Sequence, residues 1–348
     1  MNQRVRSEAG DGVIRVVAAD DSALMRRMIK DILATDPSIE VCGVARNGAE
    51  AVDMVDRLQP DVVVMDVEMP VMDGLEALQQ IVARHPVAVV MFSAITTRDA
   101  EATIRALELG AVDFVLKPKG WGLESVRREL IEKVKMARGA RRKRLRARPE
   151  APTPGLRLPG TGQRVVAIGT STGGPRALQE VVPRLPPSLP ACVLVVQHMP
   201  PGFTRSLAER LNTLSKLPVR EAEPGDPVRD GVVYIAPGGW HMVVGGDGRI
   251  SLEDSPPIGG LRPAADITMR STAEVYGPNV LGVVLTGIGH DGREGARAIK
   301  AKRGIVLAEH ESTCVIYGMP RAVIEAGYAD LVVPLDLVAA EIARIVAG

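Results

Sequence analysis

Ser171 stands in Gly169-Thr-Ser-Thr-Gly173, a stretch with the pattern G-x-S-x-G. In this pattern the flanking glycines allow a sharp turn that lifts a serine hydroxyl above the edge of a sheet. A short apolar run precedes the turn, and Pro175, a residue favoured in the first turn of a helix, follows it. We therefore expect a strand, a tight turn and a helix, with Ser171 as a candidate nucleophile.

The same residues are one substitution from the dinucleotide-binding pattern G-x-G-x-x-G, because Ser171 occupies the place of the second glycine. A phosphate cradle at a helix N-terminus is therefore a second interpretation, and a plain tight turn is a third. The motif alone leaves all three open.

A second set of reactive side chains lies in the first half of the chain. Asp20 and Asp21 follow one apolar run and Asp66 another, while Ser93 and Lys117 follow two further runs. Carboxylates that converge on one point need a hard cation, and Mg²⁺ prefers a few carboxylates together with waters and phosphate oxygens. A carboxylate can also accept a phosphoryl group as an acyl phosphate. Lysine and serine would then contact the phosphoryl oxygens.

The elements that must position these residues alternate between short apolar runs and helical periodicity. We expect strands at 13–19, 41–45, 61–65, 87–92 and 113–116, and helices at 22–34, 48–58, after Gly74, after Arg98 and at 123–138. Repeated units of this kind predict a parallel sheet covered on both faces, with ligands at the carboxyl ends of the strands. The fold class is α/β.

This half resembles a two-component receiver domain. The motifs that carry the resemblance are Asp20-Asp21, Val63-Val-Met-Asp-Val-Glu-Met-Pro70, Met72-Asp-Gly74, Ser93-Ala94 and Lys117-Pro118. The resemblance implies a flavodoxin-like fold and phosphorylation of Asp66. It implies that Asp20, Asp21 and Asp66 hold Mg²⁺ together with the carbonyl of Glu68, and that Lys117 stabilises the phosphoryl group. Ser93 and Phe114 occupy the positions of the switch residues.

Composition narrows the class of protein. The 348 residues suffice for two domains, and a hydrophobic fraction of 46% is that of a globular chain. Aromatic residues make up 3%, which disfavours stacking platforms for single-stranded nucleic acid, and a net charge of +1 provides no general attraction to nucleic acid or anionic membranes. The three cysteines are far apart, which predicts reduced, buried thiols. Without a signal peptide or a membrane span, we expect a cytoplasmic protein.

A basic run from Arg138 to Arg148 and scattered prolines after it predict a linker. We therefore expect a receiver domain at 13–137, a basic and proline-containing linker at 138–162 and a catalytic domain at 163–348. No recognition helix is evident downstream, which disfavours DNA binding.

His198 follows the apolar run 191–197, the next expected strand after Ser171. A dinucleotide-binding unit would carry an acid near this strand end, so Gln197 and His198 weaken the nucleotide interpretation. His198 is a possible general base, with His85, His241, His290 and His310 as rivals; His241 lies in an expected hairpin region, 234–244. Asp291 follows the expected strand 280–285 on a glycine-rich loop. The three side chains meet only if these strands are neighbours.

The second half resembles the effector domain of the chemotaxis protein-glutamate methylesterases, the CheB family. The matching motifs are Ile168-Gly-Thr-Ser-Thr-Gly-Gly-Pro175, Val196-Gln-His-Met-Pro-Pro-Gly-Phe-Thr-Arg-Ser-Leu-Ala-Glu-Arg-Leu211, Tyr234-Ile-Ala-Pro-Gly238, Leu285-Thr-Gly-Ile-Gly-His-Asp-Gly292 and Tyr317-Gly-Met-Pro320. The order Ser, His, Asp differs from that of the α/β-hydrolases. We expect instead a doubly wound, mainly parallel esterase domain.

The resemblance implies a catalytic triad in which Ser171 is the nucleophile, His198 the base and Asp291 the group that orients the imidazole. The amide of Ile288 contributes to the oxyanion hole, and Thr172 supports it. Three positions depart from the common family pattern: His290, Leu261 and Thr170. His290 introduces a second imidazole beside Asp291.

The whole resemblance implies a phosphorylation-activated esterase of bacterial chemotaxis adaptation, which hydrolyses glutamate methyl esters on chemoreceptors and deamidates receptor glutamines. Its partners would be methyl-accepting chemoreceptors as substrate and a CheA-like histidine kinase as phosphodonor. Mg²⁺ would be required in the receiver domain, and no cofactor in the esterase domain. Two rivals remain: a non-catalytic scaffold of receptor arrays and a nucleotide-binding oxidoreductase.

Overall fold

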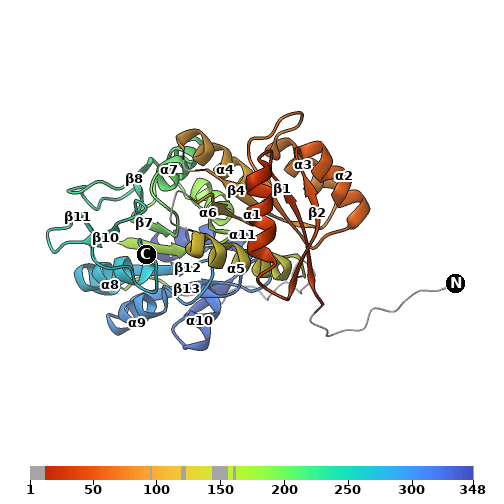
Figure 1. Ribbon diagram of the computed structural model, residues 1–348. Coiled ribbons are helices and arrows are strands. Elements are labelled where there is room, and N and C mark those ends of the chain that lie inside the picture. Colours follow the sequence, from red (N-terminus) through yellow and green to blue (C-terminus); the bar gives the residue numbers. More distant parts are fainter. Residues whose placement is uncertain (1–11, 95, 119–122, 143–155, 160–161, 348) are drawn as a thin grey trace. The chain divides into compact units, whose positions relative to one another are not determined.

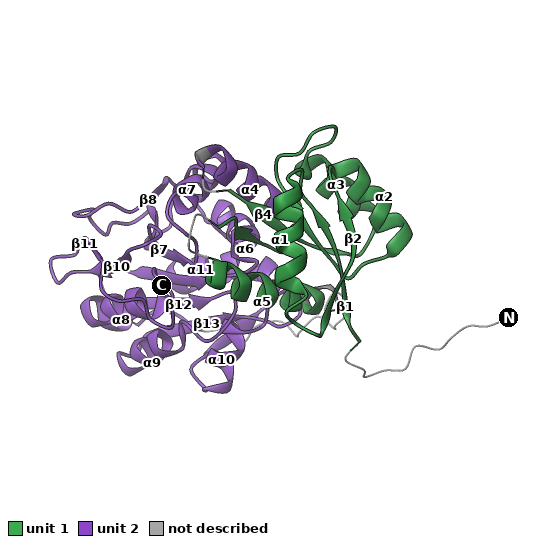
Figure 2. Ribbon diagram, viewed as in Figure 1, with its two compact units in different colours: residues 1–95, 109–141 green, residues 96–108, 142–348 purple. Residues whose placement is uncertain are grey.

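The computed structural model describes residues 12–94, 96–118, 123–142, 156–159 and 162–347. The chain divides into two compact units, one of residues 1–95 and 109–141 and the other of residues 96–108 and 142–348 (Figure 2). Residues 143–155 of the expected linker lie outside the described part. Among the described residues, no helix combines the length and the apolar character that a membrane span requires.

The first unit contains a parallel sheet of five strands in the order β2-β1-β3-β4-β5. Strands β3 and β4 are buried along their whole length, as their continuous apolar sequences predict. The strands are β1 (Ile14–Ala19), β2 (Ile39–Ala45), β3 (Val62–Asp66), β4 (Ala88–Ser93) and β5 (Asp113–Leu116). The prediction of a receiver-like sheet is confirmed, with strand ends within a few residues of those expected.

Helices flank this sheet (Figure 1). Side chains of α1 and α5 share one hydrophobic core with β1, β3, β4 and β5, while α2 packs against α3. The first three helices begin at side-chain caps, Ser22, Asn47 and Asp73, which accept hydrogen bonds from backbone amides. The helices of this unit are α1 (Ala23–Leu33), α2 (Gly48–Leu58), α3 (Gly74–Arg84) and α5 (Leu123–Arg142). Helix α4 (Thr97–Leu109) follows β4 in the chain, and all of it except its last residue is assigned to the second unit (Figure 2).

The second unit is built on a seven-stranded sheet in the order β14-β13-β12-β6-β7-β9-β8, in which every pair is parallel. The strands are β6 (Val165–Thr170), β7 (Cys192–Gln197), β8 (Val219–Glu221), β9 (Val233–Ile235), β12 (Val280–Val284), β13 (Ile305–Glu309) and β14 (Leu331–Val333). β6 comes first in the sequence and lies between β7 and β12. The strand order therefore reverses beside β6, and ligand sites of doubly wound sheets form at such a point.

Helices cover both faces of this sheet, which confirms the expected doubly wound fold (Figure 1). Helix α6 packs against α7 and α11, whereas α8 packs against α9 and α9 against α10. The helices are α6 (Gly174–Val181), α7 (Phe203–Leu214), α8 (Ala265–Tyr276), α9 (Arg293–Ala301), α10 (Met319–Glu325) and α11 (Leu335–Ala347), with short 3₁₀ turns η2 (Val182–Arg184) and η3 (Gly277–Asn279).

The hairpin expected at 234–244 is wrong in its position. Its first part forms β9 and joins the parallel sheet, while β10 (His241–Val244) pairs in antiparallel fashion with β11 (Ile250–Glu253). The residues that turn the chain back are therefore in the glycine-rich stretch 245–248, between two strands of four residues each. Tyr234, which we placed in the hairpin, is fully buried in the sheet.

The cysteines follow the expectation in part. Cys192 and Cys314 are buried and Cys42 is only partly buried, and all three are free thiols. Burial raises the pKa of the Cys192 thiol to about 12, so this side chain behaves as a small apolar group.

Candidate functional site

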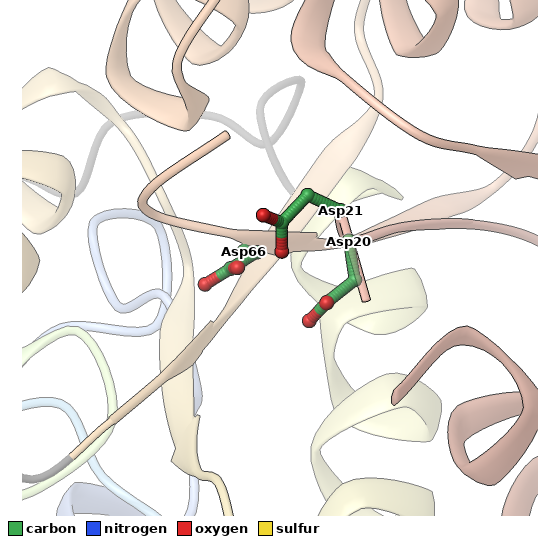
Figure 3. Close-up of side chains that lie close together, drawn as sticks. All are labelled: Asp20, Asp21 and Asp66. Carbon is green, nitrogen blue, oxygen red and sulfur yellow. The ribbon is translucent and has the colours of Figure 1, made fainter. Parts of the chain in front are cut away.

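Three carboxylates converge in the first unit at the carboxyl ends of adjacent strands. Asp20 and Asp21 follow β1 and Asp66 ends β3, and one oxygen atom of each lies within 4.8 Å of the others (Figure 3). Asp20 and Asp66 are buried, whereas Asp21 is exposed. Three of the four residues that we expected at a metal site are thus brought together by their carboxylates.

Lys117, directly after β5, supplies a positive charge to this cluster. Its Nζ lies 2.9 Å from Asp20 Oδ2 and 2.8 Å from Asp66 Oδ2. Burial raises the pKa of Asp66 to about 6, although the hydrogen bond from Lys117 acts in the opposite direction. Burial would lower the pKa of Lys117, but its hydrogen bonds with Asp66 and Asp20 outweigh that effect and raise it. The three carboxylates carry more negative charge than one ammonium neutralises. A divalent cation bound by their oxygen atoms would compensate the remainder.

The expected switch residues are buried near the same strand ends. Ser93 ends β4 with no exposed surface, and its carbonyl accepts the Lys117 amide at 2.7 Å. Phe114 lies on β5 and is 5% exposed. Glu68 is exposed in the loop after β3, and the role of its carbonyl stays a prediction.

In the second unit, Ser171 occupies the turn between β6 and α6. Its amide donates to the Thr286 carbonyl at 3.0 Å, and its carbonyl accepts a hydrogen bond of 2.9 Å from Gln197 Nε2. Gly173 has a φ of 80°, a backbone conformation that favours glycine and lets α6 begin at the next residue. The serine is therefore held from both neighbouring strands, since Gln197 ends β7 and Thr286 follows β12.

His198 and Asp291, two members of the expected triad, are joined by a side-chain contact. His198 directly follows β7, and its amide donates to the Thr170 carbonyl at 3.2 Å. Its Nε2 lies 2.7 Å from Asp291 Oδ2. A neutral imidazole bound in this way carries its proton on Nε2, which leaves Nδ1 as the basic nitrogen. Among the described residues, no hydrogen-bond partner is found for this buried Nδ1.

The Asp291 carboxylate lies at the N-terminus of α8. It accepts hydrogen bonds from the amides of Ala265 at 2.6 Å and Asp266 at 2.9 Å. Burial alone would raise the pKa of Asp291, but the hydrogen bonds from His198 and from these amides outweigh it and hold the pKa below its ordinary value. The carboxylate thus stays charged beside the imidazole, in a favourable position for the helix dipole.

Two buried residues that sequence reasoning missed support the serine loop. Thr286 accepts from Ser171 through its carbonyl, and its hydroxyl donates to the Thr172 carbonyl at 3.0 Å. Its amide donates to Glu309 Oε2 at 2.8 Å. Glu309 is fully buried, and this burial raises its pKa to about 7. A carboxyl at the end of the buried strand β13 was the available signal.

The expected oxyanion residues belong to the serine loop and to the loop after β12. Thr172 is buried and directly follows the serine, and Ile288 is partly buried in the loop after β12. Gly287, beside Ile288, approaches closely: a Cβ there would lie 2.8 Å from the Ser171 Cβ. The two loops are therefore adjacent, while the role of each amide stays a prediction.

The departures from the family pattern lie in different surroundings. His290 is exposed, whereas Asp291 is buried. Thr170 is buried, and its hydroxyl donates to the Thr286 carbonyl at 2.9 Å, so it reinforces the serine loop. Leu261 is partly buried and exchanges backbone hydrogen bonds with Ile258.

The rival histidines have other contacts. His85 bonds to Asp56 in the first unit, and His310 bonds to Ser312 after β13. His241 is fully buried on β10, where its Nδ1 accepts the Ala264 amide at 3.2 Å. It therefore supports the start of α8, the helix that holds Asp291.

Comparisons with known proteins find relatives of both units. The sequence profile of the CheB methylesterase family matches residues 166–342, and that of the response regulator receiver domain matches residues 16–125. Among solved structures, the CheB methylesterase catalytic domain of Thermotoga maritima is similar with a TM-score of 0.52 and 46% identity, covering 53% of this chain and 100% of that chain.

Relatives match nearly the full length. A protein of Symbiobacterium thermophilum named protein-glutamate methylesterase/protein-glutamine glutaminase is 49% identical over 354 residues, which cover 96% of this chain and 97% of the relative. A protein of the same name from Thermotoga maritima is 46% identical, with 93% of this chain and 96% of the relative covered.

Proposed function

Because this chain belongs to the CheB methylesterase family, we propose that it is a phosphorylation-activated protein-glutamate methylesterase that also acts as a protein-glutamine glutaminase. The observation that carries the proposal is the contact of 2.7 Å between His198 Nε2 and Asp291 Oδ2, beside a serine at the end of the adjacent strand. The receiver domain, matched over residues 16–125, supports the regulatory part.

Ser171, His198 and Asp291 act as the catalytic triad. Ser171 Oγ attacks the carbonyl carbon of a glutamate methyl ester while His198 Nδ1 takes the hydroxyl proton. Asp291 stabilises the resulting imidazolium through Nε2–H. The same proton then passes to the departing methoxide, which leaves as methanol, and the glutamyl group stays on Ser171 as an ester. A water molecule, deprotonated by His198, hydrolyses that ester and restores the serine.

The negative oxygen of each tetrahedral intermediate needs preorganised donors. We assign the Ile288 amide to this role, with Thr172 in support, because their loops meet beside Ser171. One such donor is typically worth about 3 kcal/mol of transition-state stabilisation. Deamidation of a glutamine follows the same steps, except that His198 protonates a departing nitrogen and ammonia is released.

The receiver domain provides the regulation. Asp66 accepts a phosphoryl group from a phosphohistidine and becomes an acyl phosphate. Asp20, Asp21 and Asp66 would hold Mg²⁺ together with the Glu68 carbonyl, and the cation would neutralise the phosphoryl oxygens. Lys117, already 2.8 Å from Asp66, would turn to those oxygens. Ser93 and Phe114 would then rearrange as a two-state element.

We further propose methyl-accepting chemoreceptors as substrate, a CheA-like histidine kinase as phosphodonor and the cytoplasm as location. The names of the relatives support a protein glutamate or glutamine as the group acted on. The receiver domain supports a phosphodonor kinase.

The decisive measurement is methanol release from methylated receptor membranes by the whole protein, with and without a small-molecule phosphodonor and Mg²⁺. Ser171→Ala is the control for the chemistry. Release that depends on the serine and rises with the phosphodonor is expected. Release that ignores the phosphodonor would contradict the regulation alone, and no serine-dependent release from any methylated receptor would contradict the esterase.

A further inference from the structure

Asp266 and Asp291 cap each other's helices. Asp266 lies in the first turn of α8, and its Oδ1 accepts the amides of Gly292 at 2.8 Å and Gly295 at 2.7 Å, at the N-terminus of α9. Asp291, next to the N-terminus of α9, accepts the amides of Ala265 and Asp266 at the N-terminus of α8. The Asp266 carboxyl thus caps α9, the helix that follows Asp291. The Asp291 carboxyl caps α8, the helix that carries Asp266.

This arrangement places two buried acids side by side. Each of the two residues is 6% exposed. The repulsion between two neighbouring carboxylates in such surroundings is poorly screened, so one of them binds a proton at a higher pH than an isolated carboxyl does. Burial and the charge of Asp291 raise the pKa of Asp266, whereas the pKa of Asp291 is held low. As pH falls, the pair therefore takes up its first proton on Asp266, whose pKa is about 6, while the charge stays on Asp291, where His198 meets it.

We propose that Asp266 is a positioning residue of the esterase. It holds the Asp291 carboxylate against His198, and its negative charge stabilises the imidazolium that His198 forms during the reaction. This inference rests on the proposed triad of Ser171, His198 and Asp291. Asp266 acts through Asp291 and through the start of α9, and it takes no part in bond making.

The coupling follows from charge. When His198 takes the serine proton it becomes a cation, and a negative charge on Asp266 then stabilises it. When His198 is neutral, no positive charge offsets the repulsion between Asp266 and Asp291, so Asp266 binds a proton more readily. An uncharged residue in place of Asp266 cannot supply the second negative charge, so the imidazolium that forms in the reaction is less stable.

Other charged groups around this pair come from several elements. His241, on β10, contacts the start of α8 through the Ala264 amide. Arg293 and Glu294, in the first turn of α9, pair with each other, and Glu294 also pairs with Arg297. These four residues stay in place in every variant used below, so they do not contribute to a difference between the variants.

The test compares kcat/KM for methanol release as a function of pH in the whole protein and in three variants. Asp266→Asn keeps an acceptor for the α9 amides and removes the charge, whereas Asp266→Ala removes both. Asp226→Asn is the matched control, because Asp226 is also buried and accepts hydrogen bonds from Arg220 and the Glu223 amide near the edge strand β8. Thermal unfolding of each variant is recorded in parallel.

We expect Asp266→Asn to keep kcat within about threefold and to move the acidic limb of kcat/KM down by roughly half to one pH unit. We expect Asp266→Ala to lower kcat about tenfold or more while KM stays within about twofold, since transition-state stabilisation is lost rather than binding. The acidic limb of Asp226→Asn should coincide with that of the unchanged protein.

An acidic limb that Asp266→Asn leaves in place would overturn the inference, and so would an equal shift in Asp226→Asn. If Asp266→Ala does not fold, the acidic limb of kcat/KM measured for Asp266→Asn is sufficient to test the inference. If Ser171→Ala loses methanol release while the acidic limb of kcat/KM is unchanged in Asp266→Asn, the proposed esterase stands and only the role of Asp266 is contradicted. Release that persists in Ser171→Ala would contradict the triad itself.

Discussion

Both units gather buried carboxylates at the carboxyl ends of central strands, but they compensate the charge differently. In the first unit, Asp20 and Asp66 share the ammonium of Lys117. In the second unit, Asp291 is held by two backbone amides at the N-terminus of α8 and by His198. The neighbouring acid Asp266 accepts two amides of its own at the start of α9.

The difference matches what each site has to do. A lysine side chain has several rotatable bonds and can follow a new partner, so the first site can accommodate a phosphoryl group and a cation. Backbone amides at helix ends cannot move without the helices. They keep a carboxylate charged and in one orientation, as a preorganised catalytic site requires. Glu309 shows a third solution, since burial raises its pKa to about 7 and it can bind a proton.

The largest expected effect concerns the nucleophile. Ser171→Ala should lower methanol release by about 10⁴-fold or more, with and without phosphodonor, because the covalent step is lost. The measurement is initial rates on methylated receptor membranes. Ser206→Ala, a change at a buried serine on α7, is the matched control and should retain activity. Residual release within tenfold of the unchanged protein would show that another group attacks the ester.

The second prediction concerns Glu309 and stability. Its folded-state pKa of about 7 lies above the ordinary value of 4.5, so folding favours the protonated form. The resulting stability is fully present below pH 4.5 and is lost as pH rises through about 7. Between pH 5 and 8 the free energy of unfolding of the unchanged protein should fall by roughly 3 kcal/mol through this group. Glu309→Gln stays neutral, so this fall should be absent in the variant.

Urea unfolding of the whole protein across this pH range tests the Glu309 prediction. Glu294→Gln, at an exposed position where the pKa of the acid is lowered, should leave the slope unchanged. A slope that Glu309→Gln does not flatten would mean that Glu309 stays charged in the folded protein.

The third prediction concerns the Lys117 ammonium in the first unit. Lys117→Met leaves Asp20 and Asp66 without their shared partner. In the absence of Mg²⁺ it should lower the free energy of unfolding by about 2 kcal/mol, which is less than for a fully buried pair because Lys117 is partly exposed. Added Mg²⁺ should restore more stability to this variant than to the unchanged protein. Lys135→Met breaks the surface pair with Asp36 and should cost less than about 1 kcal/mol. Equal responses of both variants to Mg²⁺ would contradict the assignment.

The smallest effect is expected from the phosphorylation site. Asp66→Asn cannot form an acyl phosphate and should lose the stimulation by phosphodonor, of the order of tenfold for a typical coupling between two sites. Basal methanol release should persist, because Ser171, His198 and Asp291 are unchanged. Asp73→Asn keeps the cap of α3 and is the control, which should be stimulated normally. Stimulation that survives in Asp66→Asn would place the phosphoryl group elsewhere.

Much of the candidate site could be predicted because its residues directly follow strands. Ser171, His198, Asp20 and Asp66 stand where continuous apolar runs end, and such ends meet at one edge of a parallel sheet. Local signals also placed the helices, since Ser22, Asn47 and Asp73 are side-chain caps in the structure. The hairpin was misplaced because β9 is only three residues long and pairs with β7 and β8, which both precede it in the chain, rather than with the strand that follows it.

The sequence by itself determined the strand-end positions of the reactive side chains, because apolar runs and turn residues act within a few positions of one another. Only the tertiary structure decided that β6 lies between β7 and β12, that Nε2 of His198 meets Asp291, and that Asp266 faces the start of α9. These facts depend on which strands pair and which helices pack, over separations of 26 residues (Asp266 to Gly292) to 115 residues (Val165 to Val280). The burial that raises the pKa of Asp266 and of Glu309 follows from the same packing.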